Sequence, residues 1–141
     1  MDDKTRMQVI NDHIQKDAFA NYLGAKVEII KPGYSRVSLV VKDHMINFHG
    51  TVHGGILFSI GDIAFAAACN SHGKISVALT VSICFLKPAY LGDHLVAEAE
   101  EEHNGRQTSL YNIKIYNKIN GELIAKSQDQ AYRKNEWFVP K

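Results

Sequence analysis

One acidic residue stands alone in the most apolar part of this 141-residue sequence. Asp62 is the only acidic or basic side chain between Gly54 and Ser71, a run built almost entirely of apolar and small residues. Carboxylates are rarely buried without a partner, because the charged form loses its hydration. A carboxylate held in an apolar cleft has a raised pKa and can act as a general base or a nucleophile. The alternative is an acid that is exposed to solvent or that makes a structural hydrogen bond.

The tripeptide His53-Gly54-Gly55 opens the same run and is the second candidate. If the run is a helix, its first backbone N–H groups are free and carry the positive end of the helix dipole. Two glycines let another molecule approach this backbone closely, so an oxyanion developing from a carbonyl would be stabilised there. By itself the tripeptide more often marks a plain tight turn, because glycines before a helix are common.

The spacing of these two candidates has a consequence for assembly. Asp62 follows His53 by nine residues, which is about 13 Å along a helix. A single chain cannot bring both to one reacting carbon atom. We therefore expect a homodimer with shared active sites, in which one chain contributes Gly55 and its partner contributes Asp62.

The hydrophobic pattern predicts one α+β domain over residues 1–141, in which an antiparallel sheet wraps around a long central helix. The expected elements are an N-terminal helix over 1–16, strands over 25–30 and 34–41, the central helix over 54–71, and strands over 74–88, 95–100, 109–118 and 123–132. The central helix is apolar on every side, so it should be enclosed. Strict alternation from Ile75 to Phe85 predicts one continuous apolar face. Exposed sheet edges favour dimerisation.

Composition and charge exclude several classes of protein. The sequence has 16 basic and 15 acidic residues and no basic patch, so no nucleic acid partner is expected. The longest apolar stretch, 56–69, is too short to span a membrane, and the acidic, polar N-terminus is unlike a signal peptide, so a cytoplasmic location is expected. The histidines His44, His49 and His53 occupy an irregular loop without further ligands, so neither a metal nor another cofactor is expected.

The run from Asn47 to Ser71, NFHGTVHGGILFSIGDIAFAAACNS, resembles the hotdog-fold acyl-CoA thioesterases, and within them the PaaI branch of phenylacetate degradation. The segments LKPAYLGD at 86–93 and DAFANYLG at 17–24 also match, so the similarity extends from about residue 17 to 132. The resemblance implies a hotdog fold, built as dimers and often as homotetramers. It also implies hydrolysis of acyl-CoA, with an aryl-acetyl or medium-chain acyl group.

The resemblance also implies roles for individual residues. Asp62 would activate water or attack the thioester, the Gly55 amide would polarise its carbonyl, His53 and Asn47 would position that group, and Thr80 would assist the water. The expected substrate-binding residues are Gly54, Phe58, Phe65, Asn70, Pro88, Lys126 and Arg133. Lys126 or Arg133 would hold the coenzyme A phosphates, because the last strand reads Ser127-Gln128-Asp129 where many relatives carry an arginine.

Two other functions remain open at this point. The first is a hotdog protein that binds acyl-CoA without catalysis, which would have no need for a buried base such as Asp62. The second is a hotdog dehydratase acting on hydroxyacyl thioesters, with His53 and Asp62 as its proton-transfer pair.

Overall fold

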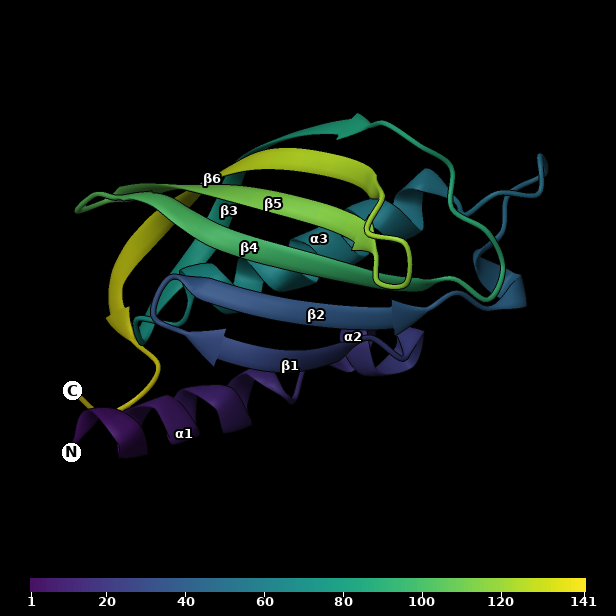
Figure 1. The fold of residues 1–141 in the computed structure, drawn as a ribbon. Coiled ribbons are helices and arrows are strands. Elements are labelled where there is room, and N and C mark those ends of the chain that lie inside the picture. The colour runs from purple at the N-terminus through teal and green to yellow at the C-terminus, as the bar shows by residue number, and fades with distance from the viewer.

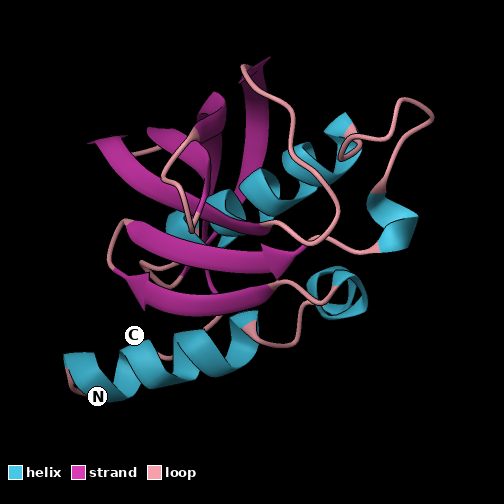
Figure 2. Ribbon diagram, turned by 45° about the vertical axis from the view of Figure 1, so that its right-hand side comes forward, coloured by secondary structure: helices cyan, strands magenta, loops and turns pink.

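The helix α3 (Gly54–Cys69) lies in the hollow of a curled six-stranded sheet (Figures 1 and 2). This arrangement comes from a computed structural model that describes residues 1–141. Every strand pairing is antiparallel, and the strands follow the order β1-β2-β4-β5-β6-β3. The strands are β1 (Lys26–Lys31), β2 (Tyr34–Val40), β3 (Lys74–Phe85), β4 (His94–Asn104), β5 (Thr108–Asn117) and β6 (Leu123–Trp137). The predicted α+β class is confirmed.

Three shorter elements precede the central helix. They are α1 (Asp3–Ile14), α2 (Ala18–Leu23) and the 3-10 turn η1 (Asp43–Met45). The sequence pattern predicted α1 but neither α2 nor η1, because so few residues show no measurable periodicity. Asp17 begins α2 by accepting a hydrogen bond from the Ala20 amide, and Gly24 ends it with a φ of 80°. Figure 1 shows α1 beside β1, with both chain termini at that end of the molecule.

Helix α3 packs against the inner face of the sheet through most of its circumference. Gly61 permits a close approach to β5, since a Cβ atom there would lie 3.3 Å from Cδ1 of Ile115. One stripe of the helix is not covered, however. Its members recur at helical spacing and are Gly55, Phe58, Ser59, Asp62 and Ala66. The expected full enclosure of α3 is therefore wrong for a single chain, and the open stripe carries both catalytic candidates.

Strand β3 lies at one edge of the sheet and has no neighbour on its outer side. Its pairing with β6 contains a bulge between Ala78 and Thr80. The bulge reverses the alternation, so that Val81 pairs with the buried Asp129 on the inner face while Val77 pairs with Tyr132 on the outer face. The predicted continuous apolar face from Ile75 to Phe85 is therefore wrong.

No helix of this structure is both long enough and apolar enough to cross a membrane.

Candidate active site

Asp62 lies midway along the open stripe of α3 and is half-buried. Burial raises the pKa of its carboxyl group above the usual range, and the negative charge of Asp17 raises it further. A raised pKa makes the carboxylate a better proton acceptor near neutral pH. Sequence reasoning identified Asp62 but not Asp17, whose position depends on the short helix α2.

The second candidate group, at the start of α3, is a closed hydrogen-bonded unit. His53 is the N-cap of the helix, and its Nδ1 accepts the backbone N–H of Gly55 at 2.9 Å. The neutral ring therefore carries its proton on Nε2. Both residues are exposed, so a ligand can reach them. The amide expected to polarise a carbonyl is thus already occupied, and His53 has to give up this bond before a carbonyl can receive it.

Asn47 shapes the loop before α3, and its side chain makes no hydrogen bond to either candidate group. Its side-chain oxygen accepts the amide hydrogens of His49 and Thr51 at 2.9 and 3.2 Å, and its Nδ2 donates to the Thr51 hydroxyl at 3.0 Å. These bonds hold a tight loop whose tip presents Phe48 with 92% of its surface exposed. Asn47 therefore positions the loop that leads into His53.

A second acid lies on the inner face of the sheet, in β6. Asp129 is only 1% exposed, and its Oδ1 accepts the Ser127 hydroxyl at 2.8 Å. Burial, together with the negative charge of Asp62, raises the pKa of Asp129 to about 6, although the Ser127 hydrogen bond opposes the shift. The sequence did contain a signal for this residue. Small residues alternate with long polar ones around it, so Asp129 falls on the side of the strand that carries the small residues. In the structure the four side chains on that side are all buried: Ala125, Ser127, Asp129 and Ala131.

The structure contradicts one of the expected acyl-binding residues. Phe65 is 1% exposed and packs edge-on against Tyr111 in the core, because it lies on the side of α3 that faces the sheet. It cannot contact a substrate at the open stripe. Phe58 does lie on that stripe and is 40% exposed.

Three other expected binding residues line two surface pockets. Gly54 and Pro88 border a pocket of about 350 Å³ beside Phe85. Asn70 borders a groove of about 480 Å³ near the C-terminal end of α3. The Asn70 amide is also structural, since it donates to the carbonyls of Ala66 and Ser76 and its oxygen accepts the Ser76 N–H.

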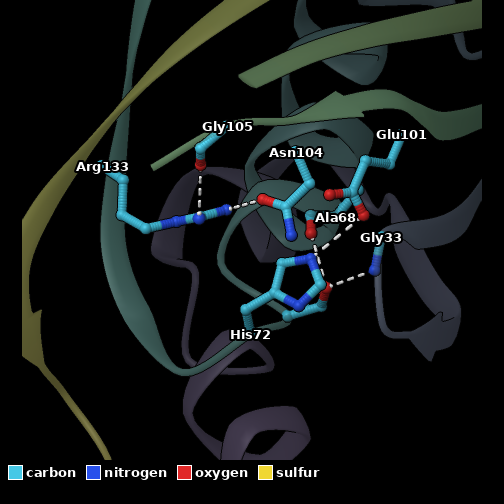
Figure 3. Close-up of polar contacts among 8 residues, drawn as sticks. Gly33, Ala68, His72, Glu101, Asn104, Gly105 and Arg133 are labelled. Atoms are coloured by element: carbon cyan, nitrogen blue, oxygen red, sulfur yellow. Dashed lines mark hydrogen bonds and ion pairs between the residues drawn. The ribbon is translucent and has the colours of Figure 1, made fainter. Parts of the chain in front are cut away.

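The two basic residues expected to hold phosphates are placed elsewhere. Lys126 pairs with Lys114 on the outer face of the sheet, away from α3. The Arg133 guanidinium donates to the Gly105 carbonyl at 3.0 Å and to the Asn104 side chain, so it anchors the β4–β5 turn (Figure 3). The assignment of both residues to coenzyme A phosphates is not supported by this structure.

Figure 3 also shows why the far end of α3 is a structural region. The ring of His72 lies 3.1 Å from a carboxylate oxygen of Glu101 in β4. Ser71 accepts the amide hydrogen of Gly33 at 2.8 Å and donates to the Ala68 carbonyl at 2.6 Å. These contacts fasten the end of the helix to the β1–β2 turn and to β4, so the rigid helix holds Asp62 in place.

Thr80 is not close to Asp62 within one chain. It pairs with the exposed Gln130 just after the β3 bulge, and this register turns its side chain to the outer face of the sheet. The expected assistance from Thr80 therefore has no support from the geometry of a single chain. The structure also brings together no cluster of three or more His, Cys, Asp or Glu side chains that could hold a metal.

Comparison with known proteins places this arrangement in a family. The model of the thioesterase superfamily matches residues 49–124, a range that includes both His53-Gly54-Gly55 and Asp62. The chain belongs to the thioesterase superfamily. It is 44% identical over 103 residues to the acyl-coenzyme A thioesterase PaaI of Escherichia coli, and the match covers 73% of this chain and 74% of that protein.

Solved structures agree with the sequence comparison. The structure of the E. coli PaaI protein from the phenylacetic acid degradation operon superposes with a TM-score of 0.88 at 37% identity, covering 92% of this chain and 94% of that one. A hypothetical thioesterase protein with coenzyme A from Streptococcus pneumoniae superposes with a TM-score of 0.82 at 27% identity, covering 89% and 98%. The hotdog fold and the resemblance to PaaI are thereby confirmed, and the protein is a thioester hydrolase.

Proposed function

We propose that this thioesterase hydrolyses acyl-CoA to the free acid and coenzyme A, with an aryl-acetyl or medium-chain acyl group as its substrate. The observation that carries this proposal is the open stripe of α3, which presents a carboxylate of raised pKa and the exposed, His53-capped N-terminus of the helix to the same side. The E. coli relative is named as an acyl-coenzyme A thioesterase, and the S. pneumoniae relative was solved with coenzyme A.

In the proposed reaction Asp62 acts as the base. Its carboxylate removes a proton from water while the water oxygen attacks the thioester carbonyl carbon, and the resulting tetrahedral intermediate expels the thiolate of coenzyme A. Direct attack by Asp62 is the alternative, and it would form an anhydride that water then hydrolyses. Both routes require the negative charge on the carbonyl oxygen to be stabilised as the bond forms.

The Gly55 amide is the proposed donor for this oxygen. Because its N–H is bonded to His53 Nδ1, we infer that the carbonyl displaces the histidine ring when substrate binds. The exchange replaces a neutral acceptor with an oxygen that becomes negative in the transition state. The new bond is therefore stronger in the transition state than in the ground state, which is the condition for accelerating the reaction.

Symmetry supports an active site shared by two chains. Gly55 and Asp62 are about 10 Å apart along α3, and the midpoint between them falls between Phe58 and Ser59, in the middle of the open stripe. If two copies of α3 cross antiparallel at this midpoint, each Gly55 lies opposite the partner's Asp62. The unpaired edge of β3, where Leu79 is 53% exposed, supplies a backbone surface for the same dimer. Assembly of such dimers into a homotetramer is proposed from the family resemblance alone.

A thiol-release assay tests the proposed function. Phenylacetyl-CoA, benzoyl-CoA and fatty acyl-CoA are offered to the native protein and to Asp62→Asn, with Asp93→Asn as a matched control outside α3. We expect thiol release from the native protein and the control, and a loss of at least about 100-fold in kcat for Asp62→Asn. Acyl-CoA binding without thiol release would instead indicate the binding protein, and water loss from a hydroxyacyl-CoA would indicate the dehydratase.

A further inference from the structure

The groove near the C-terminal end of α3 has a lining suited to an apolar ligand. This open groove has a volume of about 480 Å³ and lies between α1, α3, the start of β3 and the C-terminal segment, and the volume is typical of small-molecule sites. Ile14, Ile63 and Ile75 form its apolar walls. The rings of His13 and Phe138, which also line it, stack with centroids 5.0 Å apart and an interplanar angle of 29°.

The groove begins next to the catalytic carboxylate. Ala66, which lines it, follows Asp62 by one helical turn on the same open stripe. Asp17 also lines the groove, and its charge is close enough to Asp62 to raise the pKa of that residue. A thioester with its carbonyl carbon beside Asp62 therefore has one end pointing along α3 into this groove.

The lining of the groove indicates which end of the thioester that is. The groove walls are mainly apolar, and the opposite charges of Lys16 and Asp17 at its border offset each other, so the groove offers no net positive charge to the phosphates of coenzyme A. We infer that this groove, walled by the stacked His13 and Phe138 rings and by three isoleucines, binds the acyl group of the substrate and favours a flat aromatic acyl group. This inference rests on the proposed function, and it assigns the acyl preference to residues outside the family motifs.

Kinetics of two variants test the acyl site. Ala66→Leu narrows the groove, and Ala18→Leu, on α2 and outside the groove, is its matched control. We expect Ala66→Leu to raise KM for phenylacetyl-CoA by about tenfold or more while leaving KM for acetyl-CoA within about twofold. Phe138→Ala removes the aromatic wall and should reduce the preference for phenylacetyl-CoA over hexanoyl-CoA, whereas Phe19→Ala, an exposed aromatic control, should not. Equal effects on all acyl groups, or none, would overturn the inference.

Two further measurements separate the alternatives. Sedimentation of Ala66→Leu shows whether the substitution instead breaks a contact between chains; dissociation would mean that a second copy, and not the acyl group, fills the groove. Methyl NMR of the native protein during titration with phenylacetate gives a readout independent of catalysis. We expect shifts at Ile14, Ile63 and Ile75 but not at the remote Ile119. Shifts only at other residues, or no shifts up to the solubility limit of phenylacetate, would overturn the inference even if the native protein releases thiol from acyl-CoA. Conversely, the expected shifts would support this groove as the acyl site even if the thiol-release assay failed.

Discussion

The Gly55 backbone N–H donates a hydrogen bond to Nδ1 of His53 at 2.9 Å. One side chain thus caps the central helix and at the same time occupies the donor that we propose for the thioester carbonyl. Capping stabilises the helix, whereas the proposed mechanism requires the cap to be released. The two roles can be separated by substitution at position 53. His53→Ala removes the acceptor of the Gly55 amide, whereas His53→Asp keeps an acceptor there.

Changes at His53 should separate stability from turnover. His53→Ala removes the cap and should lower the free energy of unfolding by about 1 kcal/mol, yet it leaves the Gly55 amide free, so we expect kcat within a few-fold of native. His53→Asp keeps a cap acceptor but holds the amide with a negative charge, and we expect kcat to fall by about 10- to 100-fold with little loss of stability. Denaturant unfolding and thiol release measure the two effects. A folded but inactive His53→Ala would show that the imidazole itself takes part in the chemistry.

The pH profile should report on Asp17. The proposed base must be ionised, so kcat/KM falls as the pH drops through the pKa of Asp62, which burial and Asp17 raise. Asp17→Asn removes the like charge that favours the protonated form, so the pKa of Asp62 falls and the acidic limb moves to lower pH. Asparagine still caps α2, so the fold should be kept. An acidic limb that does not move would show that Asp17 does not influence the base.

Asp129 should make the protein less stable as the pH rises. Its pKa is raised to about 6 in the folded chain, against about 3.9 in an unfolded chain. The folded state therefore retains a proton that the unfolded state has lost, and stability decreases as the pH rises from about 4 through 6. Asp129→Asn should raise the free energy of unfolding at pH 8, by up to about 3 kcal/mol, and the gain should disappear near pH 4.

Denaturant unfolding at both pH values measures this effect, with the exposed Glu102→Gln as the control. A destabilised Asp129→Asn at pH 8 would mean that the ionised carboxylate makes a favourable interaction in the folded protein. A loss of activity without a change in stability would instead assign Asp129 to the chemistry around Asp62.

The parts of the fold that sequence predicted are those governed by long, local patterns. The central helix and the strand β5, where the inward-facing Tyr111, Ile113 and Ile115 are fully buried, follow from periodicity. The bulge at Leu79 could not be predicted, because the alternating residues fit either face and only the pairing with β6 decides between them.

The candidate site likewise has residues that the sequence predicted and residues that it did not. Asp62 and His53-Gly54-Gly55 were found because an acid in an apolar run and glycines at a helix start are local signals. Phe65 was misassigned because apolar residues on all sides of α3 do not reveal which side faces the sheet. The acyl groove was missed because α1, α3, β3 and the C-terminal segment meet only in the folded chain.

The central claim is that each active site takes Gly55 from one chain and Asp62 from the other, and mixed dimers test it most directly. Asp62→Asn removes the base, and Gly55→Pro removes the amide donor together with its hydrogen bond to His53, at a position in the first helical turn where proline is tolerated. Each variant alone should be inactive. After unfolding and refolding in equal amounts, half of the dimers are mixed and one of their two sites is intact, so thiol release should recover to about a quarter of the native rate. No recovery from a mixture shown by mass spectrometry to contain mixed dimers would contradict the shared site.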